Sequence, residues 1–141
     1  MPENKFKSLF RILFLLPFIV MFIRPATADS PIKLLAYGDS LTHGYGLEAG
    51  DTFPERLQSA LGLAGYSVMV INGGNSGDTS ASGLSRLDWA LLDEPQVVII
   101  ELGANDGLRG LEPSETRENL RKIVDGFKRF GAKVLLTGMQ A

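Results

Sequence analysis

The sequence predicts a doubly wound α/β fold, in which helices cover both faces of a parallel sheet. Apolar runs of strand length alternate along the chain with segments whose apolar residues recur at helical spacing. The clearest run, Val97-Val98-Ile99-Ile100, is uninterrupted and β-branched, which is typical of a strand buried on both faces. We therefore expect a flavodoxin-like three-layer α/β/α sandwich with a parallel sheet.

Three further runs complete the predicted sheet. Ile32 to Tyr37 is apolar apart from Lys33, and Ser67 to Ile71 is rich in β-branched residues. Val134 to Leu136 forms a short last strand, and the sequence reaches Ala141 without a helix that would cover it. We therefore expect residues 29–141 to be the N-terminal part of a domain that is incomplete at its C-terminal end.

Capping and helix-breaking residues delimit the predicted helices. These helices run from Thr52, which forms a capping-box pattern with Glu55, to the glycines at 62–65, from Thr79 or Ser80 to Pro95, and from Pro113 to Gly131. The apolar residues expected to be buried are Phe53, Leu57, Ala60, Leu61 and Ala64 in the first helix, Leu84, Leu87 and Leu91 in the second, and Leu120, Ile123, Val124, Phe127 and Phe130 in the third.

The first 28 residues have the pattern of a secretory signal peptide. A basic start, with Lys5, Lys7 and Arg11, precedes the apolar run 12–23, and Ala26-Thr27-Ala28 fits a small-residue cleavage site. The apolar run contains Pro17 and is shorter than the roughly 18 residues that a spanning helix needs. We expect cleavage before Asp29, no stable membrane insertion afterwards, and a periplasmic or secreted protein.

Composition excludes several classes of function. The sequence has no cysteine and one histidine, so we expect neither disulfides nor a cysteine-based or histidine-rich metal site. We also expect no cofactor. Loss of residues 1–28 removes four of 14 basic and one of 16 acidic side chains, leaving 10 against 15, a formal charge of −5. Without a basic stripe to neutralise phosphates, a nucleic-acid partner is not expected.

Three loops with polar or glycine-rich sequences follow predicted strands. Gly38-Asp39-Ser40 follows the first strand, Gly73 to Asp78 follows the second, and Gly103-Ala104-Asn105-Asp106 follows the third. Because the carboxyl ends of parallel strands meet at one edge of a sheet, these loops converge. Ser40 is then available as a nucleophile, and its N–H, the Gly77 N–H and the Asn105 side-chain amide are available to stabilise an oxyanion.

Together these motifs resemble the GDSL, or SGNH, hydrolases. Gly38-Asp39-Ser40-Leu41, Gly77 within Ser76-Gly77-Asp78-Thr79-Ser80, and Gly103-Ala104-Asn105-Asp106 are similar to the first three sequence blocks of that family. The run Glu101 to Gly110 is most similar to the exported bacterial thioesterase, lysophospholipase and arylesterase branch. The resemblance implies an SGNH hydrolase fold and a small acyl-ester or thioester substrate.

Carried over to this sequence, the resemblance implies that Ser40 is the nucleophile and that Ser40, Gly77 and Asn105 donate to the oxyanion. It also implies that the loop 107–111 lies beside the acyl chain, so that Leu108 and Leu111 are candidates for an apolar wall; ordinary loop packing explains both leucines equally well. The family's fourth block, Asp-x-x-His, has no counterpart after Asn105. The base and its orienting acid are therefore missing, and we expect this chain to turn over substrate poorly.

Other polar residues of these loops have simpler interpretations. We expect His43, three residues after Ser40, to be a surface histidine rather than a substitute base. Asp39 and Asp106 are expected to accept hydrogen bonds that fix the loops, and Glu101 to be a paired structural carboxylate. A second hypothesis is a phosphate-binding module without catalysis, in which the loop with Ser40, Thr42 and Gly44 cradles a phosphate.

Overall fold

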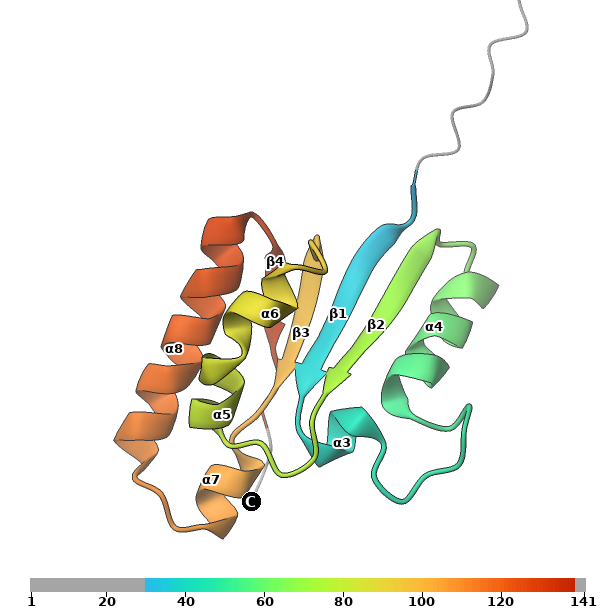
Figure 1. Cartoon of the computed structure of the whole chain (residues 1–141). Coiled ribbons are helices and arrows are strands. Elements are labelled where there is room, and N and C mark those ends of the chain that lie inside the picture. Colours follow the sequence, from blue (N-terminus) through green and yellow to red (C-terminus); the bar gives the residue numbers. More distant parts are fainter. Residues whose placement is uncertain (1–29, 139–141) are drawn as a thin grey trace, which may run out of the picture.

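The structure is a computed structural model that describes residues 30–138. Its sheet has the order β2-β1-β3-β4, and all neighbouring strands are parallel (Figure 1). The strands are β1 (Ile32–Gly38), β2 (Val68–Gly74), β3 (Val97–Glu101) and β4 (Lys133–Leu136). The predicted fold class is therefore confirmed. The proposed signal peptide, residues 1–28, lies outside the described residues.

Six helices within residues 30–138 surround the sheet. In Figure 1, α5 (Ser80–Ser85), α6 (Leu87–Leu91) and α8 (Pro113–Phe130) lie on one side of the sheet, and α4 (Phe53–Leu63) lies on the other side next to β2. Two short helices, α3 (Ser40–His43) and α7 (Ala104–Leu108), lie where the strand arrows end. None of the helices in this part of the chain is long and apolar enough to cross a membrane.

The core lies between the sheet and the α5, α6 and α8 layer. Tyr37 and Ile100 from the sheet and Ile123 and Phe127 from α8 are fully buried. The rings of Tyr37 and Phe127 meet edge to face with centroids 5.3 Å apart. Burial of one such side chain contributes about 1.5–3 kcal/mol. This packing fixes α8, and with it the loop from α7, against the ends of β1 and β3.

Two helix predictions are corrected. The helix from Thr52 forms with its capping box, but Pro54 is the buried residue of α4. Phe53, Ala60 and Ala64, which were expected to be buried, are exposed. The physical reason is that α4 packs mainly on β2, where the Gln58 side chain donates to the Val68 carbonyl. The helix from Thr79 is not continuous, because it breaks at Arg86 between α5 and α6.

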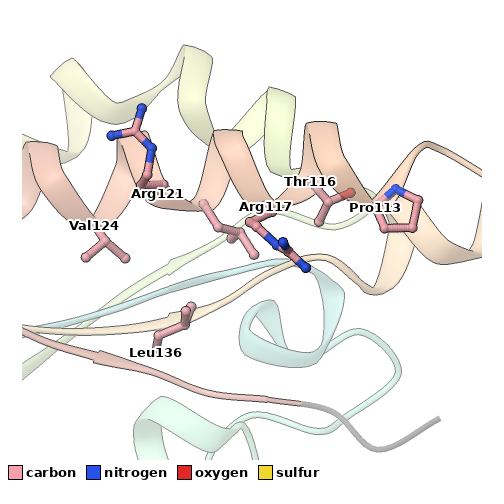
Figure 2. A pocket seen from close by; sticks show the side chains of 7 residues that line it. Pro113, Thr116, Arg117, Arg121, Val124 and Leu136 are labelled. Atoms are coloured by element: carbon pink, nitrogen blue, oxygen red, sulfur yellow. The ribbon is translucent and has the colours of Figure 1, made fainter.

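Within residues 30–138, β4 is the last strand of the sheet on the side opposite β2. Leu135 and Leu136 are both exposed in the described part of the chain. Figure 2 shows Leu136 facing Val124 of α8. Both residues line a pocket of about 480 Å³.

Candidate active site

The ends of three strands lie side by side. Gly38, the last residue of β1, pairs with Gly74 of β2 and with Glu101 of β3. The loop that follows each of these strands therefore starts at the same edge of the sheet (Figure 1). The prediction that the three motif loops converge is confirmed.

Two glycines allow α3 to approach this edge closely. A Cβ atom on Gly38 would lie 2.1 Å from the Thr42 hydroxyl oxygen, and one on Gly74 would lie 2.2 Å from the His43 nitrogen. Both distances are far below van der Waals contact, so a side chain at either position would displace α3. The first turn after β1 is thus held against β2 because neither glycine carries a side chain.

Ser40 is the first residue of α3 and is half-buried. Asp39 precedes it as the N-cap, is fully buried, and accepts a hydrogen bond from the Leu41 N–H at 3.0 Å. The N–H of Ser40 has no acceptor within the helix, because the first N–H groups of a helix precede its hydrogen-bond ladder. The expectation that Asp39 fixes this loop is confirmed.

Asn105, in α7, links all three loops. Its Nδ2 atom donates to the Asp39 carboxylate at 3.1 Å and to the Asp78 carbonyl at 2.9 Å. Asp78 directly follows Gly77, which has a left-handed backbone with φ of 86°. An amide nitrogen carries only two N–H groups. Both donors of Asn105 are therefore engaged, and donation to an oxyanion requires that Asp39 or Asp78 be exchanged.

A buried carboxylate supports Asn105 from the next position. Asp106 accepts hydrogen bonds from the Ser80 N–H at 2.8 Å, from the Ser80 hydroxyl and from the Thr116 hydroxyl at 3.0 Å. Asn119 of α8 donates in turn to the Ser80 hydroxyl at 3.1 Å. The network joins α5, α7 and α8, and it confirms the expectation that Asp106 fixes its loop.

Sequence analysis missed an arginine beside this edge. The Arg86 guanidinium contacts Asp78 and the Gly38 carbonyl and lies over the ring of Tyr37. The sequence carries a weak signal for it, since Ser82, Gly83 and Ser85 favour helices poorly and so mark a possible break just before Arg86.

Glu101 lies at the end of β3 and accepts a hydrogen bond from the Thr42 hydroxyl at 3.0 Å. Burial raises the pKa of its carboxyl group, and the negative charge of Asp39 raises this pKa further. Within residues 30–138 no basic side chain forms an ion pair with Glu101. The expected pairing is thus with a hydroxyl group and not with a cation.

A pocket of about 690 Å³ opens beside α7. Leu102, Leu108, Leu120 and Leu136 contribute apolar side chains to its lining. Leu108 is 85% exposed and so lies at the mouth of the pocket. Leu111 is 39% exposed and does not line it, although its N–H donates to the Asp106 carbonyl.

His43 is exposed, as expected, and its Nδ1 lies 3.3 Å from the Gly74 carbonyl oxygen. No hydrogen bond joins its ring to Ser40 in the described chain. Within residues 30–138 no group of three or more histidine, cysteine or acidic side chains could hold a metal ion.

The fold and this edge define a doubly wound α/β protein whose candidate site lies at the carboxyl ends of its strands. The chain belongs to the GDSL-like Lipase/Acylhydrolase family, whose sequence model matches residues 36–141.

Two relatives and one solved structure illustrate the similarity. The chain is 44% identical over 124 residues to an arylesterase of Vibrio mimicus, covering 86% of this chain and 62% of the relative. It is 39% identical over 122 residues to thioesterase 1/protease 1/lysophospholipase L1 of Escherichia coli, covering 86% and 57%. The SGNH-hydrolase family esterase AlinE4 matches with a TM-score of 0.77 at 43% identity, over 82% of this chain and 62% of that structure. The chain thus spans 57–62% of the length of these relatives.

Proposed function

We propose that this chain carries the nucleophile and the oxyanion donors of an exported serine hydrolase that cleaves acyl esters or thioesters through an acyl-Ser40 intermediate. The observation that carries the proposal is the pair of hydrogen bonds from Asn105 to Asp39 and Asp78, because it ties the three motif loops together beside Ser40. The names of the relatives, arylesterase and thioesterase 1/protease 1/lysophospholipase L1, support the same substrate class.

In the proposed reaction the Ser40 Oγ atom attacks the carbonyl carbon of the substrate. A C–O bond forms while the π electron pair of the carbonyl moves onto its oxygen, which becomes negative. The N–H groups of Ser40 and Gly77 and the amide of Asn105 are the proposed donors to that oxygen. Each such donor lowers the barrier by about 3 kcal/mol. Collapse of the intermediate expels the alcohol or thiol, and water then hydrolyses acyl-Ser40 to the carboxylic acid.

The proton of Ser40 needs an acceptor in this scheme. The family resemblance assigns that role to an Asp-x-x-His block, which has no counterpart in the 141 residues, and His43 contacts the Gly74 carbonyl instead. We therefore propose that these residues by themselves catalyse only weakly. An oxyanion site and substrate binding without the triad leave at best roughly 10³–10⁴-fold acceleration over water.

We further propose that the acyl chain of the substrate lies in the pocket beside α7. Leu108 at its mouth and Leu102, Leu120 and Leu136 within it offer an apolar lining, and Ala104 of the same lining directly precedes Asn105. Leu111 lies on the same loop as Leu108, and we retain it as a candidate contact of the acyl chain at the mouth of the pocket. Burial of each CH₂ group of the chain would contribute about 0.8 kcal/mol.

The test compares hydrolysis of an aryl butyrate ester by this chain with hydrolysis by a chimera. In the chimera, the segment of the Vibrio mimicus arylesterase that follows the matched region is appended after Ala141. We expect slow turnover by the chain, much faster turnover by the chimera, and loss of both with Ser40→Ala. Ser76→Ala changes an exposed serine next to Gly77 and serves as the matched control.

Two results would contradict the proposal. Turnover by the chimera that survives Ser40→Ala would remove Ser40 from the role of nucleophile. Fast, Ser40-dependent turnover by the chain alone would show that a base exists within these residues. The phosphate-binding alternative predicts instead that inorganic phosphate shifts the amide resonances of Ser40 and Thr42 at millimolar concentration while the chimera remains inactive.

Export is the last part of the proposal and is supported by the sequence pattern of residues 1–28. Expression in a Gram-negative host followed by N-terminal sequencing of the protein from the periplasmic fraction tests it. We expect a mature chain that begins at Asp29. Recovery of the uncleaved chain from the cytoplasm or from the membrane would contradict export with cleavage.

A further inference from the structure

Arg86 forms an unusual set of contacts for a residue that lies between two helices. Its Nε atom donates to the Asp78 carboxylate at 2.6 Å, and its Nη2 atom donates to the Gly38 carbonyl at 2.9 Å. The centre of the guanidinium lies 4.0 Å from the centroid of the Tyr37 ring. The Arg86 side chain is only 24% exposed and that of Asp78 is 7% exposed, so this ion pair is largely shielded from water.

These contacts join the two turns that carry the proposed oxyanion donors. Gly38 lies two residues before Ser40, and Asp78 directly follows Gly77. Asn75 completes the connection, because its N–H donates to the Gly38 carbonyl at 2.9 Å and its side chain donates to the Asp78 carboxylate at 2.7 Å. Arg86 and Asn75 thus bridge Gly38 and Asp78 in a closed ring of hydrogen bonds.

The guanidinium group is suited to this bridge. Its planar donors point in fixed directions, so two N–H groups can engage a carboxylate and a carbonyl together, whereas a lysine ammonium is a point charge on a flexible stem. A cation over an aromatic face gains a further attraction when it is shielded from water. The Tyr37 ring therefore helps to fix the plane of the Arg86 guanidinium.

We propose that Arg86 is a positioning residue of the oxyanion site, an inference that rests on the function proposed above. Its guanidinium holds the turn of Ser40 and the turn of Gly77 at a fixed separation, so that their N–H groups point to the same oxygen. It touches neither the substrate nor the reacting atoms. A displacement of about 1 Å between groups that must act together can lower a rate by about 10²-fold.

The first experiment measures phosphonylation of Ser40 by an alkyl fluorophosphonate. In this reaction the Ser40 oxygen bonds to phosphorus while the P–F bond breaks, the hydroxyl proton of Ser40 and the fluoride leave as HF, and the phosphoryl oxygen occupies the oxyanion site. For Arg86→Gln we expect the maximal rate constant to fall about 10–10²-fold, with little change in the probe concentration that gives half the maximal rate. Arg86→Lys should recover part of the rate, and Arg56→Gln, at an exposed arginine paired with Asp51, should leave it unchanged.

This design separates positioning from stability. A residue with a merely structural role would lower the thermal midpoint but leave the maximal rate constant of the folded protein unchanged, so that result overturns the proposal. If the wild-type chain does not react with the probe at all while it is folded, the proposed function is decided by the reaction of the chimera with the same probe, and an unreactive chimera would contradict it. The role of Arg86 is then decided by the second measurement.

The second measurement follows backbone amides by NMR and needs no reactivity. We expect Arg86→Gln to speed hydrogen exchange of the Asn75 N–H and to shift the amide resonances of Ser40 and Gly77, with smaller changes in Arg86→Lys and none in Arg56→Gln. If Arg86→Gln does not fold, the Arg86→Lys spectrum is decisive. Unchanged Asn75 exchange together with unchanged Ser40 and Gly77 resonances overturns the proposal.

Discussion

Tyr37 makes the stability of this chain sensitive to alkaline pH. Its ring is fully buried, and its hydroxyl donates to the Gly83 carbonyl. Burial raises the pKa of Tyr37 from its ordinary value of 10.0 to about 12, although the Arg86 cation opposes the shift. Because the folded pKa lies above the unfolded one, the stabilisation is complete below about pH 10 and is lost as the pH rises towards 12.

The size of the effect follows from the two pKa values. Each pKa unit corresponds to about 1.4 kcal/mol, so the difference between 10.0 and about 12 amounts to about 2.7 kcal/mol once both forms are ionised. Part of this free energy of unfolding is already lost below pH 12. Between pH 9 and pH 11.5 we expect the tyrosine to remove about 2 kcal/mol from the free energy of unfolding.

Urea unfolding at a series of pH values measures this loss. The comparison is between the wild-type chain and Tyr37→Phe, because all other titrating groups are common to both. Tyr45→Phe, at a tyrosine that is 80% exposed, is the control and should follow the wild-type curve. If the curves for the wild type and Tyr37→Phe run parallel from pH 9 to 11.5, the assignment of the alkaline loss to Tyr37 is wrong.

Two further predictions concern the surroundings of the site. Asp106→Asn should lower the free energy of unfolding by about 2–3 kcal/mol, because groups that donate hydrogen bonds to the buried carboxylate lose an acceptor. Thermal denaturation should then show a midpoint roughly 8–15 °C lower. The control Asp93→Asn changes an exposed acid, and its free energy of unfolding should stay within about 0.5 kcal/mol of the wild type. Equal losses of stability in Asp106→Asn and Asp93→Asn would contradict the argument. The pKa of Glu101 is raised, so ionisation of its carboxyl group opposes folding. At pH 7 the free energy of unfolding of Glu101→Gln, measured with urea, should therefore equal or exceed that of the wild type. Below about pH 4, where the wild-type carboxyl group is protonated, any such advantage should disappear.

Local sequence patterns predict much of the fold. The run Val97 to Ile100 predicts its strand because a segment without polar residues fits only the centre of a sheet. The helix from Pro113 to Gly131 forms within those bounds, because its start and end depend on the two residues themselves. The buried face of α4 was not predictable in the same way, since it depends on which elements lie beside β2.

Some features of the candidate site could likewise be predicted from the sequence, and others could not. The convergence of the loops with Ser40, Gly77 and Asn105 follows from strand order alone, because parallel strands end at one edge. The break at Arg86 was not predicted, since Leu84, Leu87 and Leu91 continue a helical pattern and the weak signal of the residues before Arg86 does not show the contacts with Gly38 and Asp78. The engagement of both Asn105 donors likewise depends on coordinates. The catalytic roles of these residues stay predictions.

The most direct test of the account is a crystal structure of the phosphonate adduct of Ser40. We predict that the phosphoryl oxygen lies about 2.7–3.1 Å from the N–H nitrogens of Ser40 and Gly77 and from the Asn105 side-chain nitrogen, with Asn105 released from one of its present partners. An adduct on another residue, or a phosphoryl oxygen that faces solvent away from Gly77 and Asn105, would contradict the claim that three loops build one oxyanion site.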